Sequence, residues 1–350
     1  MPAPAPAVTS FANPTPAASA APLCAVLIDA EEDFDWLRPV RGTPHDVACM
    51  RQLADVQGIL AAWGAVPTYL LTWPVLRDAG IVAGLRGRLE RGQCRVGVQL
   101  HPWVTPPFSE PAEPCYSFAG NLAAALEEQK LLELTRLFRA CFGEGPKIFR
   151  AGRYGLGPDT PALLERHGFL VDTSLAPHTS FASEAGPDFS ASDCAPFWFG
   201  AARRLLELPL CRGIAGWGGP AAARLYGRLA SAAPGQRGFA HAHLPGVLAW
   251  TRCAERITLS PEGNDAAAAG RLVRFLLRRG QNVLALSLHS SSLSVGHNPY
   301  VRSRAELHWF YDRLSAILDM LASRFAVRFV AAPDLPALLS SPAARLPDAA

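Results

Sequence analysis

The sequence lacks the features that mark nucleic-acid-binding and membrane-spanning proteins. Charged residues make up only 18% of its 350 residues, and no run of five or more like charges occurs. This excludes a basic nucleic-acid surface and a disordered acidic tail. No stretch approaches the roughly 18 apolar residues that would span a bilayer. Because the formal net charge is only +3, we expect a small or neutral partner, no nucleic acid and no membrane span.

Paired cysteines and a secretory signal are lacking too. The eight cysteines are scattered, and none forms a C-x-x-C pair or has the ligand spacing of a structural zinc site. We interpret them as reduced core residues, which favours a cytoplasmic location. No basic residue precedes Arg38, so the Ala- and Pro-rich start lacks the basic region of a signal peptide. Residues 1–21 and 343–350 are therefore expected to be disordered tails.

Short apolar runs alternate with longer amphipathic stretches along most of the chain, which is typical of parallel strands covered by helices. Seven or eight such units favour a barrel. The sequence thus predicts one α/β domain over residues 22–342, a distorted (β/α) barrel of about seven strands, with a doubly wound sheet as the alternative. The predicted strands are 23–28, 66–71, 95–100, 147–150, 170–172, 282–288 and 326–330. The predicted helices are 46–63, 75–89, 122–142, 158–167 and 305–323.

Two segments outside this rhythm have weaker interpretations. Residues 174–204 are rich in Pro, Ser, Asp and aromatic residues, and a loop of this length in a compact domain is usually a lid or a binding segment. His297 and His308 flank a predicted loop and helix start, where we expect packing or solvent exposure in preference to a substrate contact.

Polar side chains of catalytic type follow four of the predicted strands. Reactive groups gather at the carboxyl ends of strands in parallel α/β folds. Taken singly, each group also fits a structural role, as a helix cap, a packed histidine or an ion pair. Their coincidence at four strand ends favours a site. The groups are the acidic run Asp29-Ala30-Glu31-Glu32-Asp33-Phe34-Asp35, then Gln99 with His101-Pro102-Trp103, then Arg150 with Arg153-Tyr154, and finally His289.

This combination of side chains fits hydrolysis. A divalent metal held by oxygen and imidazole ligands would polarise a carbonyl and lower the pKa of a bound water. One carboxylate would then remain as general base and one histidine as general acid. The spacing of Asp29 and Glu31 suits such a site, because residues i and i+2 at an extended strand end point the same way. Both carboxylates can then face one cavity.

The motifs IDAEEDFDW, VGVQLHPWVTPPF, FRAGRYGLGPDT with LVDTS, GPDFS, LSPEG and LSLHSSSL resemble, in order and spacing, those of the polysaccharide deacetylase superfamily. This is the NodB-homology fold, and the resemblance is closest to its WalW-type branch. It implies a distorted barrel, a carbohydrate substrate, and deacetylation assisted by a divalent metal, often zinc.

Carried over motif by motif, the resemblance assigns roles to individual residues. The implied catalytic residues are Asp29 as general base, Arg150 as the group that orients it, and His289 as general acid. The implied metal ligands are Glu31, His101 and the residue at position 99, with Glu32 or Asp33 as weaker carboxylate candidates. The implied substrate-binding residues are Trp103, Arg153 and Tyr154, whose aromatic members suit the apolar faces of sugars.

The chain departs from the expected H-x-H-P-W pattern at Gln99, which leaves only His101 in that motif. A glutamine offers an amide oxygen, a poor ligand for zinc. Metal binding is then expected to be weakened or lost. Alternatively, a carboxylate from Glu32 or Asp33 replaces the missing histidine and gives a site with hard oxygen ligands. Two alternatives to a deacetylase stay open: a catalytically impaired protein that binds a glycan or an exopolysaccharide-pathway partner on the same fold, and a metal-free glycosidase that uses two of the acids after the first strand.

Overall fold

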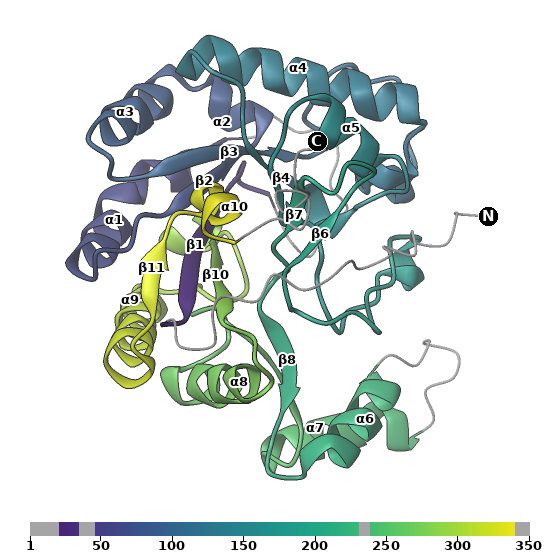
Figure 1. Cartoon of the computed structure of the whole chain (residues 1–350), viewed down its shortest axis with the longest axis vertical. Helices are drawn as coiled ribbons and strands as arrows, with labels where there is room; N and C mark the ends of the chain where they lie inside the picture. The colour runs from purple at the N-terminus through teal and green to yellow at the C-terminus, as the bar shows by residue number, and fades with distance from the viewer. Residues whose placement is uncertain (1–20, 35–45, 231–238, 340–350) are drawn as a thin grey trace, which may run out of the picture.

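A curled, mostly parallel sheet forms the core of the molecule (Figure 1). The computed structural model describes residues 21–34, 46–230 and 239–339. The strand order is β10-β1-β2-β3-β4-β5-β7-β6, with β11 paired to the start of β1. The strands are β1 (Leu23–Ala30), β2 (Thr68–Leu71), β3 (Arg95–Leu100), β4 (Ile148–Ala151), β5 (Val171–Asp172), β6 (Phe197–Phe199), β7 (Leu205–Glu207), β10 (Val283–His289) and β11 (Arg328–Val330).

This order confirms the predicted distorted barrel and excludes the doubly wound alternative. A doubly wound sheet reverses its strand order at a switch point, whereas β1 to β5 here lie side by side in sequence order. Of the eight strands in the main order only β6 is antiparallel. Six of the seven predicted strands lie in this order; the seventh, 326–330, is β11, which pairs in parallel with β1, while β7 was not predicted. Every residue of β1 is buried, as expected for a parallel strand covered on both faces.

Single backbone hydrogen bonds bridge the interval between β5, β7 and β10. The amide of Leu210 donates to the carbonyl of Leu175 at 2.9 Å, and the amide of Leu259 donates to the carbonyl of Cys211 at 2.8 Å. The amide of Ser287, on β10, donates to the carbonyl of Leu259 at 3.1 Å. These single contacts, in place of a full ladder, account for the distortion of the barrel.

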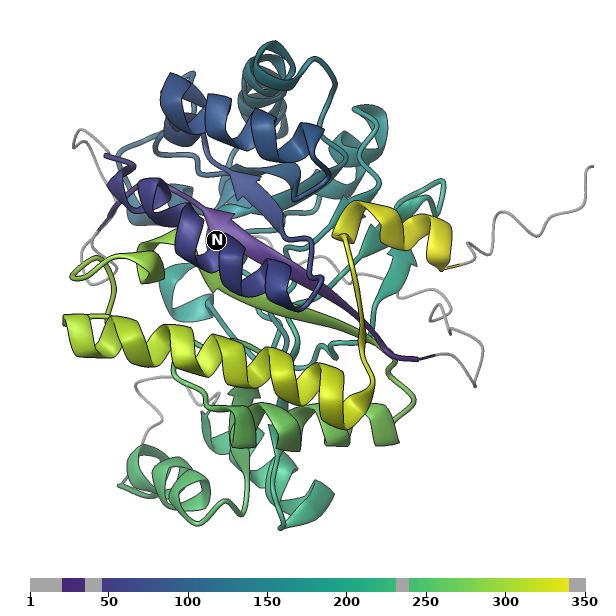
Figure 2. The ribbon, with the colours of Figure 1, turned by 90° about the vertical axis from the view of Figure 1, so that its left-hand side faces the viewer.

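Helices surround the sheet, and α1 and α9 lie side by side over β1 (Figure 2). Their ends follow local chemistry: Asp265 and Ser303 cap α8 and α9 through their side chains, and Gly143 ends α4 with a φ of 84°. The helices around the sheet are α1 (Leu53–Ala62), α2 (Trp73–Arg77), α3 (Ala79–Glu90), α4 (Ala124–Phe142), α5 (Thr160–Arg166), α8 (Ala266–Arg278), α9 (Arg304–Asp319) and α10 (Leu335–Leu338).

Between Cys211 and Leu259 the chain makes an excursion away from the barrel, drawn at the bottom of Figure 1. A separate antiparallel pair of strands leads into and out of two helices that pack on each other. Its elements are β8 (Arg212–Ala215), α6 (Gly219–Ala230), α7 (Phe239–Trp250) and β9 (Glu255–Thr258). The sequence predicted none of them, because the strands have four residues each and Pro245 interrupts the helical pattern of α7.

The remaining predictions are mostly accurate in position. The seven predicted strands begin and end within two residues of the observed ones. The segment 174–204 is a loop except for β6 and a short 3-10 turn. The predicted tails lie outside the described residues, apart from residue 21. Among the helices of residues 21–34, 46–230 and 239–339, none has the length and apolar character needed to cross a membrane.

Candidate active site

The register of the sheet brings the predicted catalytic residues onto one of its faces. Asp29 on β1 is the register partner of His289 on β10, and Gln99 on β3 is the partner of Arg150 on β4. Side chains alternate along each strand, so Glu31 shares the face of Asp29. The carboxyl ends of four parallel strands therefore place these groups together.

Arg150 fixes the Asp29 carboxylate. Asp29 is 2% exposed and Arg150 is 1% exposed. One guanidinium nitrogen, Nη1, donates to Asp29 Oδ1, while Nε donates to the carbonyl and to Oγ1 of Thr173 at 3.1 and 2.8 Å. Burial lowers the pKa of Arg150, but the charge and hydrogen bond of Asp29, together with Tyr154 and Asp172, raise the pKa overall. Because Thr173 fixes the guanidinium of Arg150, the charge-assisted hydrogen bond from Arg150 leaves the Asp29 carboxylate little freedom to rotate.

His289 lies on the other side of the same carboxylate. Its Nε2 is 3.3 Å from Asp29 Oδ2, and its Nδ1 is 2.8 Å from Glu262 Oε2. The other oxygen of Glu262 accepts from the backbone amide of His289 and from the hydroxyl of Ser292, at 2.8 and 2.6 Å. Burial lowers the pKa of His289, but Glu262 and Glu31 outweigh it and raise the pKa to about 10. The ring is therefore a protonated imidazolium near neutral pH, able to donate a proton.

Glu262 was not predicted as a site residue. It lies in the loop after β9, within the LSPEG motif. An acid close behind a strand end is the same signal that drew attention to Asp29, but β9 itself was not predicted, so the signal was missed. Its function is to orient the ring of His289 and to stabilise the positive charge.

His101, directly after β3, is oriented by a glutamate at its Nδ1, as His289 is. His101 is 1% exposed, its Nδ1 is 2.8 Å from Glu32 Oε1, and its Nε2 is 3.7 Å from Glu31 Oε2. Burial lowers the pKa of His101, but Glu32 outweighs it and raises the pKa. Because Glu32 occupies Nδ1, Nε2 is the nitrogen that faces Glu31 and can bind a ligand.

The backbone at Gly152, just after β4, packs directly against the ring of His101. A Cβ atom on Gly152 would lie 2.3 Å from Cδ2 of His101 and 2.8 Å from the carbonyl oxygen of Leu100. Only glycine permits this approach. The imidazole is thus held by Glu32 at one edge and by the β4 turn at another.

Two buried oxygens on this face test whether a metal fits. Glu31 Oε1 and Gln99 Oε1 have no hydrogen-bond partner among the described residues, and buried oxygens of this kind normally have one. Burial raises the pKa of Glu31 to about 8, against the charges of His289 and His101. A divalent cation would satisfy both oxygens and favour the ionised carboxylate. Glu31, Gln99 and His101 therefore fit a divalent metal, with two oxygen donors and one imidazole nitrogen.

Comparisons with known proteins agree with the barrel. No protein-family model matches the sequence, and no curated protein matches it either.

Among solved structures, a Parabacteroides distasonis protein assigned as a glycoside hydrolase/deacetylase has a TM-score of 0.55 at 12% identity, over 90% of this chain and 70% of that chain. Puue allantoinase has a TM-score of 0.52 at 13% identity, over 94% of each chain. A Mycobacterium smegmatis protein assigned as a polysaccharide deacetylase has a TM-score of 0.49 at 16% identity, over 97% of this chain and 95% of that chain. The chain has the fold of the polysaccharide deacetylases. At these identities the likeness establishes the fold alone.

Within this polysaccharide deacetylase fold, two of the predicted substrate-binding residues have partners in the protein. Trp103 donates from Nε1 to Glu32 at 2.8 Å, and its ring lies 4.2 Å from that of His101. Arg153 donates to the hydroxyl of Ser117 at 2.6 Å and pairs with Glu184. Trp103 thus helps to hold the ring of His101, and Arg153 is bound to Ser117 and Glu184.

Tyr154 stays close to the catalytic groups. The guanidinium of Arg150 lies 5.7 Å from the centre of its ring, and Phe181 stacks on it at 6.2 Å. Burial raises the pKa of Tyr154 to about 12, so its hydroxyl is neutral. Arg153 and Tyr154 have φ values of 53° and 56°, in the left-handed region that non-glycine residues adopt uncommonly.

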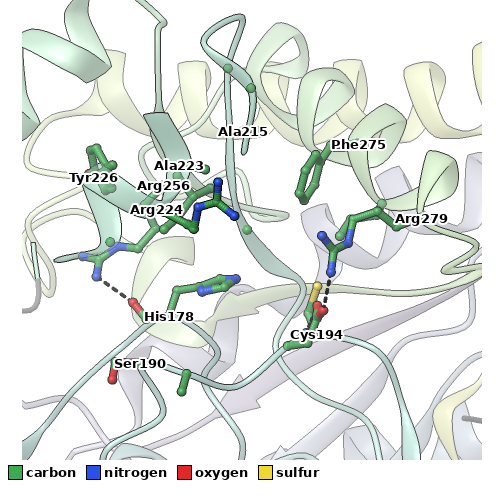
Figure 3. A pocket seen from close by; sticks show the side chains of 18 of the residues that line it. His178, Ser190, Cys194, Ala215, Ala223, Arg224, Tyr226, Arg256, Phe275 and Arg279 are labelled. Carbon is green, nitrogen blue, oxygen red and sulfur yellow. Dashed lines mark hydrogen bonds and ion pairs between the residues drawn. The ribbon is translucent and has the colours of Figure 1, made fainter. Parts of the chain in front are cut away.

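The molecule also has a cavity of about 900 Å³ (Figure 3). None of the site residues described above lines it. It lies between the excursion and α8, and arginines from three elements line it. Arg279 pairs with Asp193 at 2.8 Å, and Arg256 donates to the carbonyl of His178 at 3.1 Å. The catalytic-type cluster and this arginine-lined cavity are therefore distinct features of the molecule.

Proposed function

We propose that this protein hydrolyses an N-acetyl amide on a carbohydrate, with a divalent metal, as a WalW-type polysaccharide deacetylase. The contact that supports this most directly is the 3.3 Å approach of His289 to Asp29, each fixed from behind by a group of opposite charge. A base and an acid so placed can serve the two proton transfers of amide hydrolysis. Eight free cysteines support the further proposal of a cytoplasmic location.

In the proposed reaction, the oxygen of a water molecule attacks the carbonyl carbon of the amide. Asp29 accepts the proton of this water, and Arg150 holds its carboxylate toward the reacting atoms. His289 then donates its proton to the amide nitrogen as the carbon–nitrogen bond breaks. The products are acetate and a free amine on the sugar. A divalent ion held by Glu31, Gln99 and His101 would supply Lewis-acid polarisation of the carbonyl.

The test is acetate release from an N-acetylated oligosaccharide by the metal-loaded protein and by an Asp29→Asn variant. The expected result is a loss of turnover of about 10²- to 10⁴-fold in the variant. Glu133→Gln, which changes an exposed acid on α4 that pairs with Arg136, serves as the control. Circular dichroism of both variants checks that the fold is intact. Full turnover in the folded Asp29→Asn protein would overturn the proposal.

Gln99 supports a second candidate, a glycan-binding protein of the same fold without catalysis. An amide oxygen in place of an imidazole lowers the affinity for zinc. Saturable oligosaccharide binding without acetate release, both in the natural protein and after metal loading, would favour this candidate. Release of a reducing sugar instead of acetate would indicate the metal-free glycosidase.

A further inference from the structure

A second group of metal-ligating side chains lies beside the candidate active site and outside the set described above. Asp33, Cys49 and His297 come from three separate segments: the turn after β1, a 3-10 turn (Ala48–Gln52), and the loop after β10. A carboxylate oxygen, the Sγ atom and an imidazole nitrogen from these residues all lie within 4.8 Å of one another. The spacing of the cysteines along the chain does not predict such a group.

Asp33 and Cys49 are fixed in place by the backbone. The two carboxylate oxygens of Asp33 accept from the amides of Ala48 and Cys49, at 2.8 and 3.4 Å. Each of these oxygens keeps a further lone pair for another donor or a cation. The side chain of Cys49 is fully buried, and burial together with the Asp33 carboxylate raises the pKa of its thiol. A dication bound to Sγ would hold Cys49 as the thiolate beside Asp33.

His297 is presented by a rigid loop. The Asn298 side chain accepts from the amides of Tyr300 and Val301 at 2.8 and 3.0 Å and donates to the hydroxyl of Ser292 at 2.8 Å. The imidazole of His297 is half-buried, and within residues 21–34, 46–230 and 239–339 no hydrogen-bond partner of its ring is found. A ring nitrogen facing a thiol and a carboxylate is thus available.

We propose that Asp33, Cys49 and His297 bind a zinc-type divalent ion at a site separate from Glu31, Gln99 and His101. A thiolate with an imidazole and a carboxylate is a borderline-soft set, which suits zinc better than the two oxygens and one nitrogen of the other set. Tetrahedral zinc with bonds of about 2.0–2.3 Å needs ligand atoms about 3.3–3.8 Å apart. The ligand atoms lie within 4.8 Å of one another, so they need to approach by no more than about 1–1.5 Å.

An ion at this site would connect the end of β1 to the loop that follows β10. These are the segments that carry Glu31 and His289, so the ion would brace the rim of the candidate active site. Three protein ligands leave a fourth position for water. Binding of this ion is independent of the proposed deacetylation.

Cobalt titration of the full-length protein, freed of metal by a chelator, tests the proposal. A thiolate bound to cobalt gives a charge-transfer absorption band in the near ultraviolet, which oxygen and imidazole ligands do not give. We expect this band in the natural protein and in a His101→Ala variant, and its loss in Cys49→Ser. His297→Gln, a change on a half-buried loop, should weaken cobalt binding at least ten-fold.

Cys141→Ser is the matched control, because Cys141 is a half-buried thiol that bonds only to the carbonyl of Leu76. It should leave the band unchanged. A natural protein without the band, or a band that survives Cys49→Ser, would overturn the proposal. Loss of the band in His101→Ala would show that thiolate binding of cobalt depends on the other set of ligands, and would also count against a separate site. None of these results depends on acetate release, so the two proposals fail separately.

Discussion

Two carboxylate–histidine pairs lie on the same face of the sheet, and they differ in what their outer nitrogen meets. In both, a glutamate lies 2.8 Å from Nδ1: Glu32 for His101 and Glu262 for His289. Nε2 of His101 faces the carboxylate of Glu31, one oxygen of which has no hydrogen-bond partner among the described residues. Nε2 of His289 faces Asp29, which already forms an ion pair with Arg150. The His101 side chain is 2% exposed and that of His289 is 20% exposed.

The difference shows how one local arrangement can serve two chemical purposes. A carboxylate at Nδ1 makes the other nitrogen a stronger ligand if a cation is near, and a stabilised proton carrier if an anion is near. Glu31 still needs a positive partner, while Asp29 has one. The comparison therefore supports the proposed metal binding by His101 and the proposed proton donation by His289.

The largest expected effect separates the two histidines directly. His289→Gln should lower turnover by about 10²- to 10⁴-fold and leave the metal content unchanged, whereas His101→Gln should lower both. Acetate release and elemental analysis of dialysed protein measure the two quantities. His308→Gln, on an exposed turn of α9, is the control. Loss of metal in His289→Gln would contradict the division of roles.

The next effect is on stability. In the metal-free protein the pKa of Glu31 is raised from 4.5 to about 8, and that of His289 from 6.5 to about 10. The folded chain then binds more protons than the unfolded chain, so the free energy of unfolding falls as pH rises, first through Glu31 and then through His289. We expect a decrease on the order of a few kcal/mol between about pH 5 and pH 10, measured by urea denaturation. Glu262→Gln should flatten the upper part of this decrease, and an unchanged slope above about pH 7 would be inconsistent with it.

A smaller effect distinguishes the two glutamates. Glu32→Gln should weaken metal binding by about 10- to 100-fold, because it removes the partner that orients His101. Glu262→Gln should leave the affinity unchanged. Glu128→Gln is a matched control, since Glu128 also lies 2.8 Å from a histidine, His167, at the surface. Competition with a chelator dye gives the affinities, and equal losses in the Glu32 and Glu262 variants would remove the contrast.

The smallest effect concerns Trp103. Trp103→Phe removes one hydrogen bond to Glu32 and keeps most of the ring contact with His101. We expect a loss of about 1–3 kcal/mol in the free energy of unfolding, with a modest fall in metal affinity. Trp309→Phe, at an indole that is 55% exposed on α9, should change neither quantity. Urea denaturation that finds the Trp103 and Trp309 variants equally stable would show that the bond to Glu32 contributes nothing.

The barrel strands could be predicted because each combines a strong apolar run with a following helix. β1 has no exposed residue, and β3 was predicted at its observed bounds. The excursion could not be predicted, since β8 and β9 have only four residues each and pair with each other across it. Short strands whose partners lie forty residues away leave little periodicity in the local sequence.

The site was predictable to the extent that it follows strand ends. Asp29, Arg150 and His289 come together because the register of parallel strands aligns residues that look unrelated along the chain. Tertiary partners such as Glu262 escape this reasoning, since the strand before it has only four residues. The grouping of Cys49 with His297 escapes it fully, because nothing in the spacing of two residues so far apart predicts their contact.

The chain leaves the barrel at Cys211 and returns at Leu259, where a single 2.8 Å hydrogen bond joins the two points. A segment whose ends meet in this way is a cassette: it can be shortened, lengthened or exchanged without changing the path of the strands beneath it. The arginine-lined cavity belongs in large part to this cassette, whereas the catalytic-type residues belong to the barrel. Mutation and selection can therefore alter the lining of the cavity without changing the catalytic-type residues.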